Sequence, residues 1–318
     1  IDSTNMAEKK GFEEEAEADG DSNTVCLEAT MHADLDTLCT VVYCTADDLL
    51  PEPKRNARRR TTDAEIVTLC VAQAIMGIPS DRRFLRVAQD RLSPLFPEIP
   101  AQAAYFKRRR RPAPLLEWFL VIFARQSPGF TDNLLLIDST PVECARSRET
   151  VLRSALSDIS DYGYCAGHSR YFWGVRLHAI FATDGTPRAF CLTSPKRDER
   201  EVGLELLGRC RRRGGETLLS DKGYASQEFS AAVMDLGAIH VRPKRKDEVG
   251  QGLHLAPIRR RIESIFWTCK DVLSLERHGA RTLPGLKERI LQRFLCLAAC
   301  ISLNYQLGRP SRALVDYC

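Results

Sequence analysis

Several motifs that identify enzyme classes are missing from this sequence of 318 residues. It has no HExxH pair and no glycine-rich loop ending in Lys followed by Ser or Thr, which argues against a zinc hydrolase and a P-loop nucleotide hydrolase. No G-x-S-x-G elbow surrounds Ser139 or Thr140, so a serine-type nucleophile is a poor interpretation. The twelve cysteines form no CxxC pair that suits zinc, and we interpret them as buried, reduced thiols.

Long hydrophobic runs are missing too. The longest apolar stretches, residues 115–124 and 295–303, are much shorter than the roughly 20 residues that span a bilayer, so we expect no membrane segment. Residues 1–30 are acidic and have no apolar core, so we expect no secretory signal there. Hydrophobic residues make up 44% of the chain, an ordinary value for a soluble protein, and the reduced thiols favour a cytoplasmic one. The length suffices for one large domain or two ordinary ones.

Charge is distributed unevenly along the chain. Residues 1–30 hold nine Asp or Glu against Lys9 and Lys10, a net charge of −7, so the remainder carries +11 of the total of +4. This acidic, polar composition predicts a disordered extension over residues 1–30. The basic remainder predicts a polyanionic partner.

Two basic clusters lie in the following hundred residues. The first comprises Lys54, Arg55, Arg58, Arg59 and Arg60, and the second comprises Lys107, Arg108, Arg109, Arg110 and Arg111. Such clusters neutralise phosphates and release counterions, which makes binding strongly salt-dependent. Tyr105 and Phe106 fit either stacking on exposed bases or anchoring in the core. A charged run is usually a solvated face, but two runs in a basic chain favour a nucleic-acid partner.

Residues 31–130 have a helical pattern. Thr62 and Glu65 fit a capping box at the start of a helix. That helix is expected to stop at Gly77, and a second helix covers residues 82–91. Two helices joined by a short turn fit either a helix-turn-helix, whose second helix enters a major groove, or an ordinary helical hairpin. The local pattern does not separate the two.

From residue 134 onward the pattern changes to strands separated by helices. We expect strands over 134–138, 171–183, 187–193, 216–220 and 238–242, and helices over 199–211, 226–236, 257–271 and 283–303. Asp184 and Gly185 predict a hairpin turn between the second and third strands. This order predicts an α/β fold in which helices flank a mixed sheet. The last helix fits either a packing helix or a dimer surface.

Three acidic residues stand in settings that suit metal binding. Asp138 ends the apolar run 134–137, Asp221 ends the run 217–220, and Glu263 lies within a predicted helix. Although 83 and then 42 residues separate them, adjacent strands would bring the aspartates together and a packed helix would supply the glutamate. Carboxylate oxygens suit Mg²⁺ or Mn²⁺. The trio therefore predicts a divalent-metal site for phosphoryl transfer.

The order of these motifs resembles that of DDE transposases of bacterial insertion sequences. The matching segments are 137–142 (IDSTPV), 168–174 (HSRYFWG) and 220–224 (SDKGY), together with Arg259, Glu263 and Lys270, which fit the R-x3-E-x6-K part of the family signature. The signature's tyrosine would fall at Ala256, so its role is not carried over. The resemblance covers roughly residues 31–318. It implies the ribonuclease H-like fold shared with retroviral integrases.

The resemblance also implies an activity. A DNA transposase would cleave strands at terminal inverted repeats and transfer them into target DNA, with Asp138, Asp221 and Glu263 as catalytic, metal-binding residues. Two Mg²⁺ or Mn²⁺ ions would activate the attacking oxygen and stabilise the leaving oxygen. The attacking group would be water in strand cleavage and then the freed 3′-hydroxyl in strand transfer. Relatives work as multimers, so the resemblance implies a homodimer or higher multimer. It also implies a bacterial cytoplasmic protein that associates with the nucleoid. Two alternatives stay open: a ribonuclease H-like nuclease without strand transfer, and a catalytically inactive, transposase-derived DNA-binding protein, against which the intact trio argues.

Basic residues near the trio have two interpretations. Arg259 and Lys270 lie four and seven residues from Glu263 on one helical stripe, where they would grip phosphates or balance the glutamate in surface ion pairs. Lys222 follows Asp221 and would contact DNA or neutralise local charge.

Four regions are expected in all. They are the extension 1–30, an all-helical DNA-binding domain over 31–130 that could hold the helix-turn-helix, a catalytic domain over 131–275, and a C-terminal helical segment over 276–318 that packs on the core.

Overall fold

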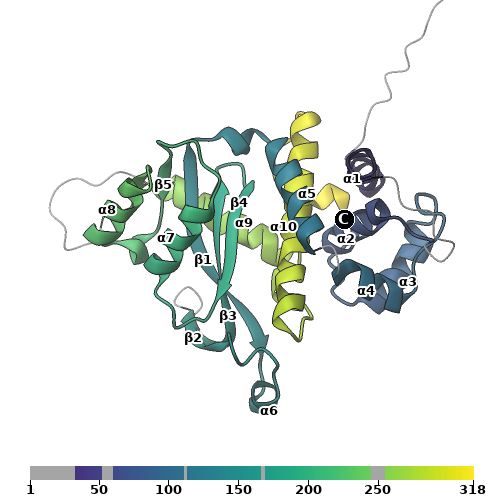
Figure 1. The fold of residues 1–318 in the computed structure, drawn as a ribbon, viewed down its shortest axis with the longest axis horizontal. Coiled ribbons are helices and arrows are strands. Elements are labelled where there is room, and N and C mark those ends of the chain that lie inside the picture. Colours follow the sequence, from purple (N-terminus) through teal and green to yellow (C-terminus); the bar gives the residue numbers. More distant parts are fainter. Residues whose placement is uncertain (1–32, 52–59, 111–112, 166–168, 245–254) are drawn as a thin grey trace, which may run out of the picture. The chain divides into compact units, whose positions relative to one another are not determined.

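The computed structural model describes residues 33–51, 60–110, 113–165, 169–244 and 255–318 (Figure 1). The predicted extension over residues 1–30 lies outside the described residues, as do Arg58, Arg59 and Arg111 from the basic clusters. For Arg259 the backbone alone is described.

Within the described residues, six strands form one mixed sheet in the second half of the chain. The strands are β1 (Leu134–Ala145), β2 (Asp161–Cys165), β3 (Arg170–Ala182), β4 (Pro187–Thr193), β5 (Thr217–Leu219) and β6 (Ile239–Val241). Their order is β2-β3-β1-β5-β6, and β4 also pairs with β3. β1, β3 and β4 are antiparallel neighbours, whereas β5 and β6 run parallel to β1.

Helices cover both faces of this sheet (Figure 1). They are α7 (Glu199–Arg209) and α8 (Gln227–Asp235) on one face, and α9 (Ala256–Asp271) and α10 (Leu283–Gln306) on the other. The short helix α6 (Arg148–Leu152) follows β1 and lies away from both faces (Figure 1). Short 3-10 turns lie at Pro128–Thr131, Lys222–Tyr224, Leu275–Arg277 and Val315–Tyr317. Alternation along the strands divides the core, because successive side chains point to opposite faces. Leu135 and Ile137 pack in a cluster with residues of α7 and α8. Leu136 and Leu219 pack in the cluster that includes α9 and α10.

Five helices precede the sheet: α1 (Leu35–Leu49), α2 (Asp63–Ile75), α3 (Asp81–Arg91), α4 (Gln102–Arg110) and α5 (Ala113–Arg125). α2 is the centre of this region, because every side chain from Ile66 to Ile75 is buried. α10 packs against both α2 and α5. A single hydrophobic cluster therefore runs from the N-terminal helices to one face of the sheet.

A buried group of polar side chains joins four of these helices. Arg289 of α10 donates to Asp81 Oδ1 of α3 at 2.6 Å, and Gln73 of α2 donates to the same oxygen at 3.0 Å. Arg109 of α4 forms ion pairs with Asp81 at 3.2 Å and with Glu288 of α10 at 2.9 Å. Burying charge is tolerated when each charge has partners. We call these five residues the polar network.

The structure confirms the predicted fold class, a mixed sheet flanked by helices with a helical region before it. The capping box is present, with the Thr62 hydroxyl accepting from Glu65 N at 3.1 Å. α2 ends before Gly77, whose φ of +61° is a conformation that glycine adopts without strain. Gly185 likewise has φ of +102° in the turn between β3 and β4.

Two local predictions are wrong, and the sequence pattern misses two short elements. β1 does not end at Asp138 but continues to Ala145, because it keeps pairing with β3 beyond the point where β5 stops. β2 and α6 were not predicted at all. The dimer-surface interpretation of the last helix also fails, since α10 is buried within the chain itself from Glu288 to Asn304.

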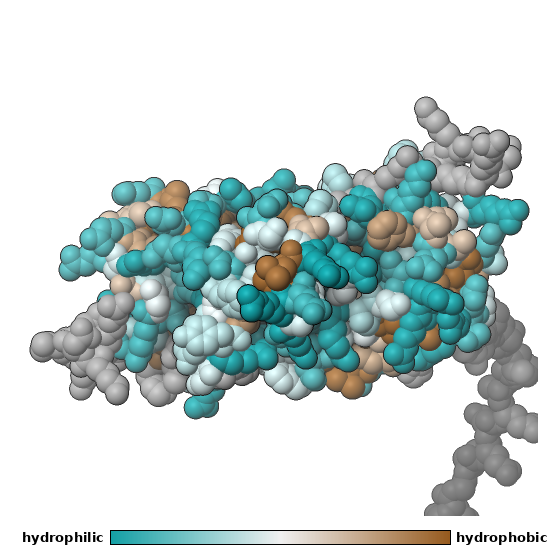
Figure 2. Space-filling model, turned by 90° about the horizontal axis from the view of Figure 1, so that it is seen from below, coloured by the Kyte–Doolittle hydropathy of each residue, from teal (hydrophilic) through white to brown (hydrophobic). Residues whose placement is uncertain are grey.

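No helix among the described residues is both long enough and apolar enough to cross a membrane. On the face drawn in Figure 2, hydrophobic residues lie as separate spots among hydrophilic ones.

Candidate active site

Asp138, Asp221 and Glu263 line a single cleft beside β1, with a volume of about 450 Å³. Asp138 and Asp221 are half-buried, and Glu263 is exposed. The cleft is thus acidic at its centre and open to a substrate.

The parallel pairing of β1 and β5 explains why the two aspartates lie together. Leu136 of β1 is the register partner of Leu219 of β5. Asp138 and Asp221 each follow their leucine by two residues, and the backbone of Asp221 is still extended. Since side chains alternate, both carboxylates point to the face on which Leu136 and Leu219 pack, which is the face that α9 covers.

α9 supplies the third carboxylate through its amphipathic pattern. Ile262, Ile265 and Phe266 are buried and fix the helix against the sheet. Glu263 lies next to this buried stripe, on the side that borders the cleft. A helical spacing of three or four residues therefore determines where Glu263 lies.

Backbone amides hold the two aspartates in place. Ser139 N–H donates to Asp138 Oδ1 at 2.7 Å, and Gly223 N–H donates to Asp221 Oδ1 at 2.7 Å. Within the described part of the chain, no three His, Cys, Asp or Glu side chains already form a group that would hold a metal ion. The chemistry of the donors nevertheless fits a hard divalent cation, because three carboxylates border one cleft.

Comparison with family models matches residues 129–299 to the transposase DDE domain. This match covers more than half of the chain and contains all three carboxylates. The chain belongs to the transposase DDE domain family. The family assignment makes the protein a transposase, and thus an enzyme that acts on DNA strands.

No curated protein sequence matches the chain. Among solved structures, the chain is similar to the cryo-EM structure of a piggyBac transposase synaptic complex with hairpin DNA, at 10% identity and a TM-score of 0.41, covering 88% of this chain and 76% of that one.

The cleft of this DDE transposase also contains an ion pair that the sequence did not reveal. Arg176 of β3 pairs with Glu199 at the start of α7, and both line the cleft. Ser139 Oγ joins them, donating to Glu199 Oε1 at 3.0 Å and accepting from Arg176 Nη1 at 3.3 Å. The one local signal was Asp198, which caps α7 and so places Glu199 in its first turn.

The three basic residues predicted near the carboxylates, Lys270, Lys222 and Arg259, differ from one another in their surroundings. Lys270 lines the cleft and pairs with Glu276 at 3.1 Å, so its ion-pair partner is not Glu263. Lys222 is exposed in the turn after Asp221. The backbone of Arg259 lies one turn before Glu263 in α9.

Two histidines lie close to the strands of the cleft. His178 of β3 is buried, and its Nε2 lies 3.1 Å from Thr193 Oγ1, while burial lowers its pKa to about 4. His240 bonds to Ser220 Oγ at 2.8 Å, and burial lowers its pKa to about 4 as well. Both imidazoles are therefore neutral near pH 7 and serve to fix hydroxyl groups.

The second basic cluster divides between surface and core. Lys107 and Arg110 are exposed. Arg108 is half-buried and pairs with Asp63 at 2.5 Å. Arg109 is only 3% exposed and belongs to the polar network. The prediction that Arg109 contacts DNA is therefore corrected, because reaching a phosphate would break two buried ion pairs.

From the first cluster, the structure describes Arg60. It is exposed and pairs with Glu98 at 3.3 Å. An exposed pair of this kind contributes about 0–1 kcal/mol, so it would not hold Arg60 away from a phosphate.

Proposed function

We propose that this transposase cuts DNA strands at the terminal inverted repeats of an insertion sequence and joins the freed ends to target DNA. One observation carries the proposal: three carboxylates from two parallel strands and a helix border one open cleft in a chain of the DDE family.

Asp138, Asp221 and Glu263 would hold Mg²⁺ or Mn²⁺, with two ions expected. Bound divalent ions would lower the pKa of the attacking hydroxyl and stabilise charge on the leaving oxygen. The amides of Ser139 and Gly223 keep the aspartates oriented before any substrate arrives. Pre-set carboxylates need no rearrangement when the reaction begins.

Cations around the cleft would position the DNA strand. Lys270 and Lys222 border the carboxylates from α9 and from the turn after β5. Arg259 would join them, one turn before Glu263. These residues would bind phosphates on either side of the scissile bond. Water would attack in cleavage and the freed 3′-hydroxyl in joining, each in line with the departing oxygen, with no covalent bond between protein and DNA.

The sheet supports a ribonuclease H-like catalytic domain over residues 131–275. Three antiparallel strands followed by two parallel ones give the order β4-β3-β1-β5-β6. We assign residues 31–130 to a DNA-binding region and residues 276–318 to a helical segment that completes the core.

Lys107, Arg110 and Arg60 would contact phosphates from the helical region, because all three are exposed. Arg108 would do so only on leaving Asp63. Arg58, Arg59 and Arg111 stay in the proposed DNA-contacting set, although they lie outside the described residues. A homodimer or higher multimer at the bacterial nucleoid would bring two DNA ends together.

The test is incubation of the full chain with labelled DNA that carries the inverted repeats flanking its coding sequence, in Mg²⁺ or Mn²⁺. Nicking and joining are scored separately on denaturing gels. Both products are expected. Nicking without joining would favour a nuclease, and binding without either product would favour an inactive DNA-binding derivative.

A further inference from the structure

An ion pair lies on the opposite face of β1 from the metal-binding aspartates, and the proposed chemistry gives it no role. Arg176 of β3 pairs with Glu199 of α7, and their side chains are only 19% and 27% exposed. Ser139, which joins the pair, follows Ile137 by two residues, so its side chain points to the face on which α7 packs. We call Arg176, Glu199 and Ser139 the clamp.

The clamp is connected to Asp138 through Ser139. The hydroxyl of Ser139 donates to Glu199 Oε1 at 3.0 Å and accepts from Arg176 Nη1 at 3.3 Å. The amide of the same residue donates to Asp138 Oδ1 at 2.7 Å. The parallel pairing with β5 ends at Leu136, and beyond it β3 alone among the described strands pairs with β1. The clamp therefore holds β1 where one of its two neighbouring strands has ended.

Glu199 also borders the turn that holds the second aspartate. Gly223 N–H donates to Asp221 Oδ1 at 2.7 Å. A Cβ added to Gly223 would lie 2.9 Å from Asp221 Oδ1 and 3.2 Å from Glu199 Oε2, so a side chain at this position would press on both carboxylates. Glu199 thus bonds to Ser139, next to Asp138, with one oxygen and borders the turn after Asp221 with the other.

Arg176 makes this arrangement compatible with an acidic cleft. Glu199 lines the cleft, and without a cation its charge would add to that of the three carboxylates there. Arg176 balances the charge of Glu199, and the Tyr164 carbonyl accepts from the same guanidinium at 3.4 Å. The clamp can therefore hold the backbone beside both aspartates without drawing a metal ion away from them.

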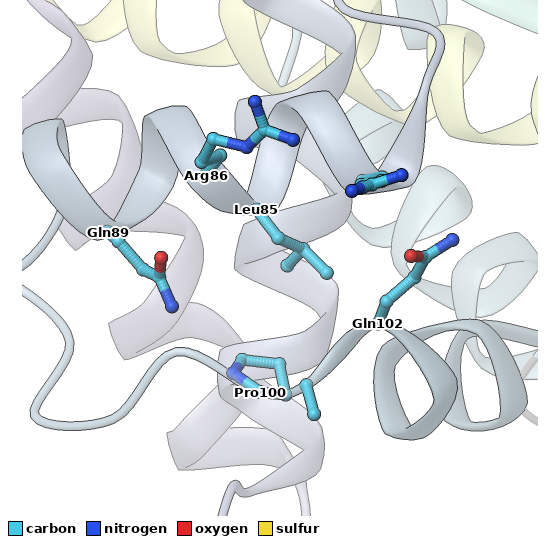
Figure 3. Close-up of a pocket in the computed structure, with 7 residues that line it drawn as sticks. Leu85, Arg86, Gln89, Pro100 and Gln102 are labelled. Carbon is cyan, nitrogen blue, oxygen red and sulfur yellow. The ribbon is translucent and has the colours of Figure 1, made fainter.

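A second hollow, between α3 and the start of α4, offers a comparison. It has a volume of about 280 Å³, and Figure 3 shows Arg86 and Gln89 of α3 on one side of it and Pro100 and Gln102 on the other. None of the described residues that line it carries a carboxylate or an imidazole, so it offers no charged ligand to a hard cation. Arg86 is therefore an arginine beside a cavity that has no metal chemistry.

We propose that the clamp sets the separation of the two aspartates and thereby the affinity of the cleft for a divalent cation. The proposal rests on the proposed function in taking that cation as the ligand of the aspartates. The members of the clamp act through the aspartates and are positioning residues. Removing groups that hold metal ligands in place typically weakens metal binding by about 10–100-fold.

The test measures Mn²⁺ binding to the full chain, from the loss of the electron paramagnetic resonance signal of free Mn²⁺. The wild type is expected to bind Mn²⁺, and Glu199→Ala to bind it about ten-fold or more weakly. Glu199→Gln, which keeps an acceptor for Ser139, should lose less affinity. Glu201→Ala is the matched control, because Glu201 is an exposed glutamate in the same turn of α7 and lies outside the clamp.

Arg176→Ala separates positioning from charge. If charge alone mattered, losing a cation near the carboxylates would tighten Mn²⁺ binding, whereas loss of positioning weakens it. Arg86→Ala should leave the affinity unchanged. In cleavage assays, Arg176→Ala and Glu199→Ala should need about ten-fold more Mn²⁺ for the half-maximal rate, with DNA affinity in EDTA unchanged. Thermal melting without metal confirms that the variants fold, and Glu199→Gln replaces Glu199→Ala if the alanine variant does not.

The proposal is overturned if folded Arg176→Ala binds Mn²⁺ as tightly as the wild type or more tightly. It is also overturned if Glu201→Ala loses as much affinity as the Glu199 variants, or if the wild type binds no Mn²⁺. A wild type whose Mn²⁺ binding depends on Glu199 and Arg176 but which never cleaves DNA would refute the proposed function and leave this proposal standing.

Discussion

The cleft and the outer side of α3 both carry arginine, but in opposite settings. Arg176 in the cleft is clamped by Glu199 and Ser139. Arg82 and Arg86 on α3 have no such partner among the described residues. A clamped arginine has a fixed position and little net charge to offer, whereas an unpaired one attracts phosphate over several ångströms. The two regions therefore differ in whether their arginines are free to meet a negatively charged partner.

The largest effect on stability is expected when Arg109 is removed from the buried polar network. Arg109→Ala leaves Glu288 buried without its partner and should lower the free energy of unfolding by about 3–5 kcal/mol. Arg110→Ala, one residue further along α4, should change it by no more than about 0.5 kcal/mol, because Arg110 is exposed. Urea unfolding of the full chain measures both. Equal costs for the two variants would show that α4 is rotated from its described orientation.

Variants of the carboxylates test whether cleavage can be lost while DNA binding is kept. Asp138→Asn, Asp221→Asn and Glu263→Gln should each reduce cleavage by on the order of 10²–10³-fold, because charge that stabilises the transition state is removed. DNA affinity measured in EDTA should stay close to that of the wild type. Glu143→Gln is the control, since Glu143 lies in β1 but pairs with Arg146 away from the cleft. Full cleavage activity in all three variants would show that the active site is assigned to the wrong residues.

Acid should weaken the sheet while leaving the arginines of α3 charged. Burial lowers the pKa of His178 to about 4, from an ordinary value of 6.5. The neutral imidazole therefore contributes stability that is fully present above pH 6.5 and is lost as the pH falls toward 4, by up to about 3 kcal/mol. In His178→Gln, unfolding by urea between pH 7 and pH 5 should depend less on pH. If the variant loses as much stability in acid as the wild type does, groups other than His178 cause the loss.

The smallest effect is expected from exposed cations of α4. Replacing Lys107 and Arg110 by Ala should weaken binding to every duplex alike. The slope of log K against log salt should become less steep by about 0.9 for each phosphate that the variant no longer neutralises. Titration by fluorescence anisotropy at several salt concentrations measures the slope. An unchanged slope would mean that this part of α4 does not approach the DNA backbone.

The sequence predicted most elements of the sheet, yet it misplaced the end of β1 for a physical reason. The apolar run 134–137 covers the part of β1 that lies close to β5 as well as β3. Beyond Leu136 no strand of the described residues pairs with the other edge, so the composition becomes polar while the strand continues. Pro141 is compatible with such an edge, where a missing N–H costs no ladder bond. The change in composition marked an edge of the sheet, not an end of the strand.

The positions of Asp138 and Asp221 followed from local patterns, but their environment did not. The pair of Arg176 and Glu199 joins residues 23 positions apart, on different elements, and the one local signal is the Asp198 cap, which places Glu199 in the first turn of α7 but does not identify its partner. The predicted DNA contact of Arg109 is wrong for a similar reason. A helix of consecutive basic residues must turn some of them inward, and the carboxylates that receive Arg109 lie on α3 and α10. Such pairings depend on how the helices pack.

The polar network has one further consequence. Arg289 ties α3 to α10, and α10 packs on β4 of the sheet, so packed elements link α3 to the sheet that carries the cleft. If the helical region binds DNA as proposed and the same protomer cuts that DNA, a set number of base pairs separates the bound sequence from the bond that is cut. Inserting about five base pairs there would turn the cleavage point to the opposite side of the double helix, since a turn takes about 10 base pairs. The cut site would then be chosen by distance and helical phase, whatever bases stand at it.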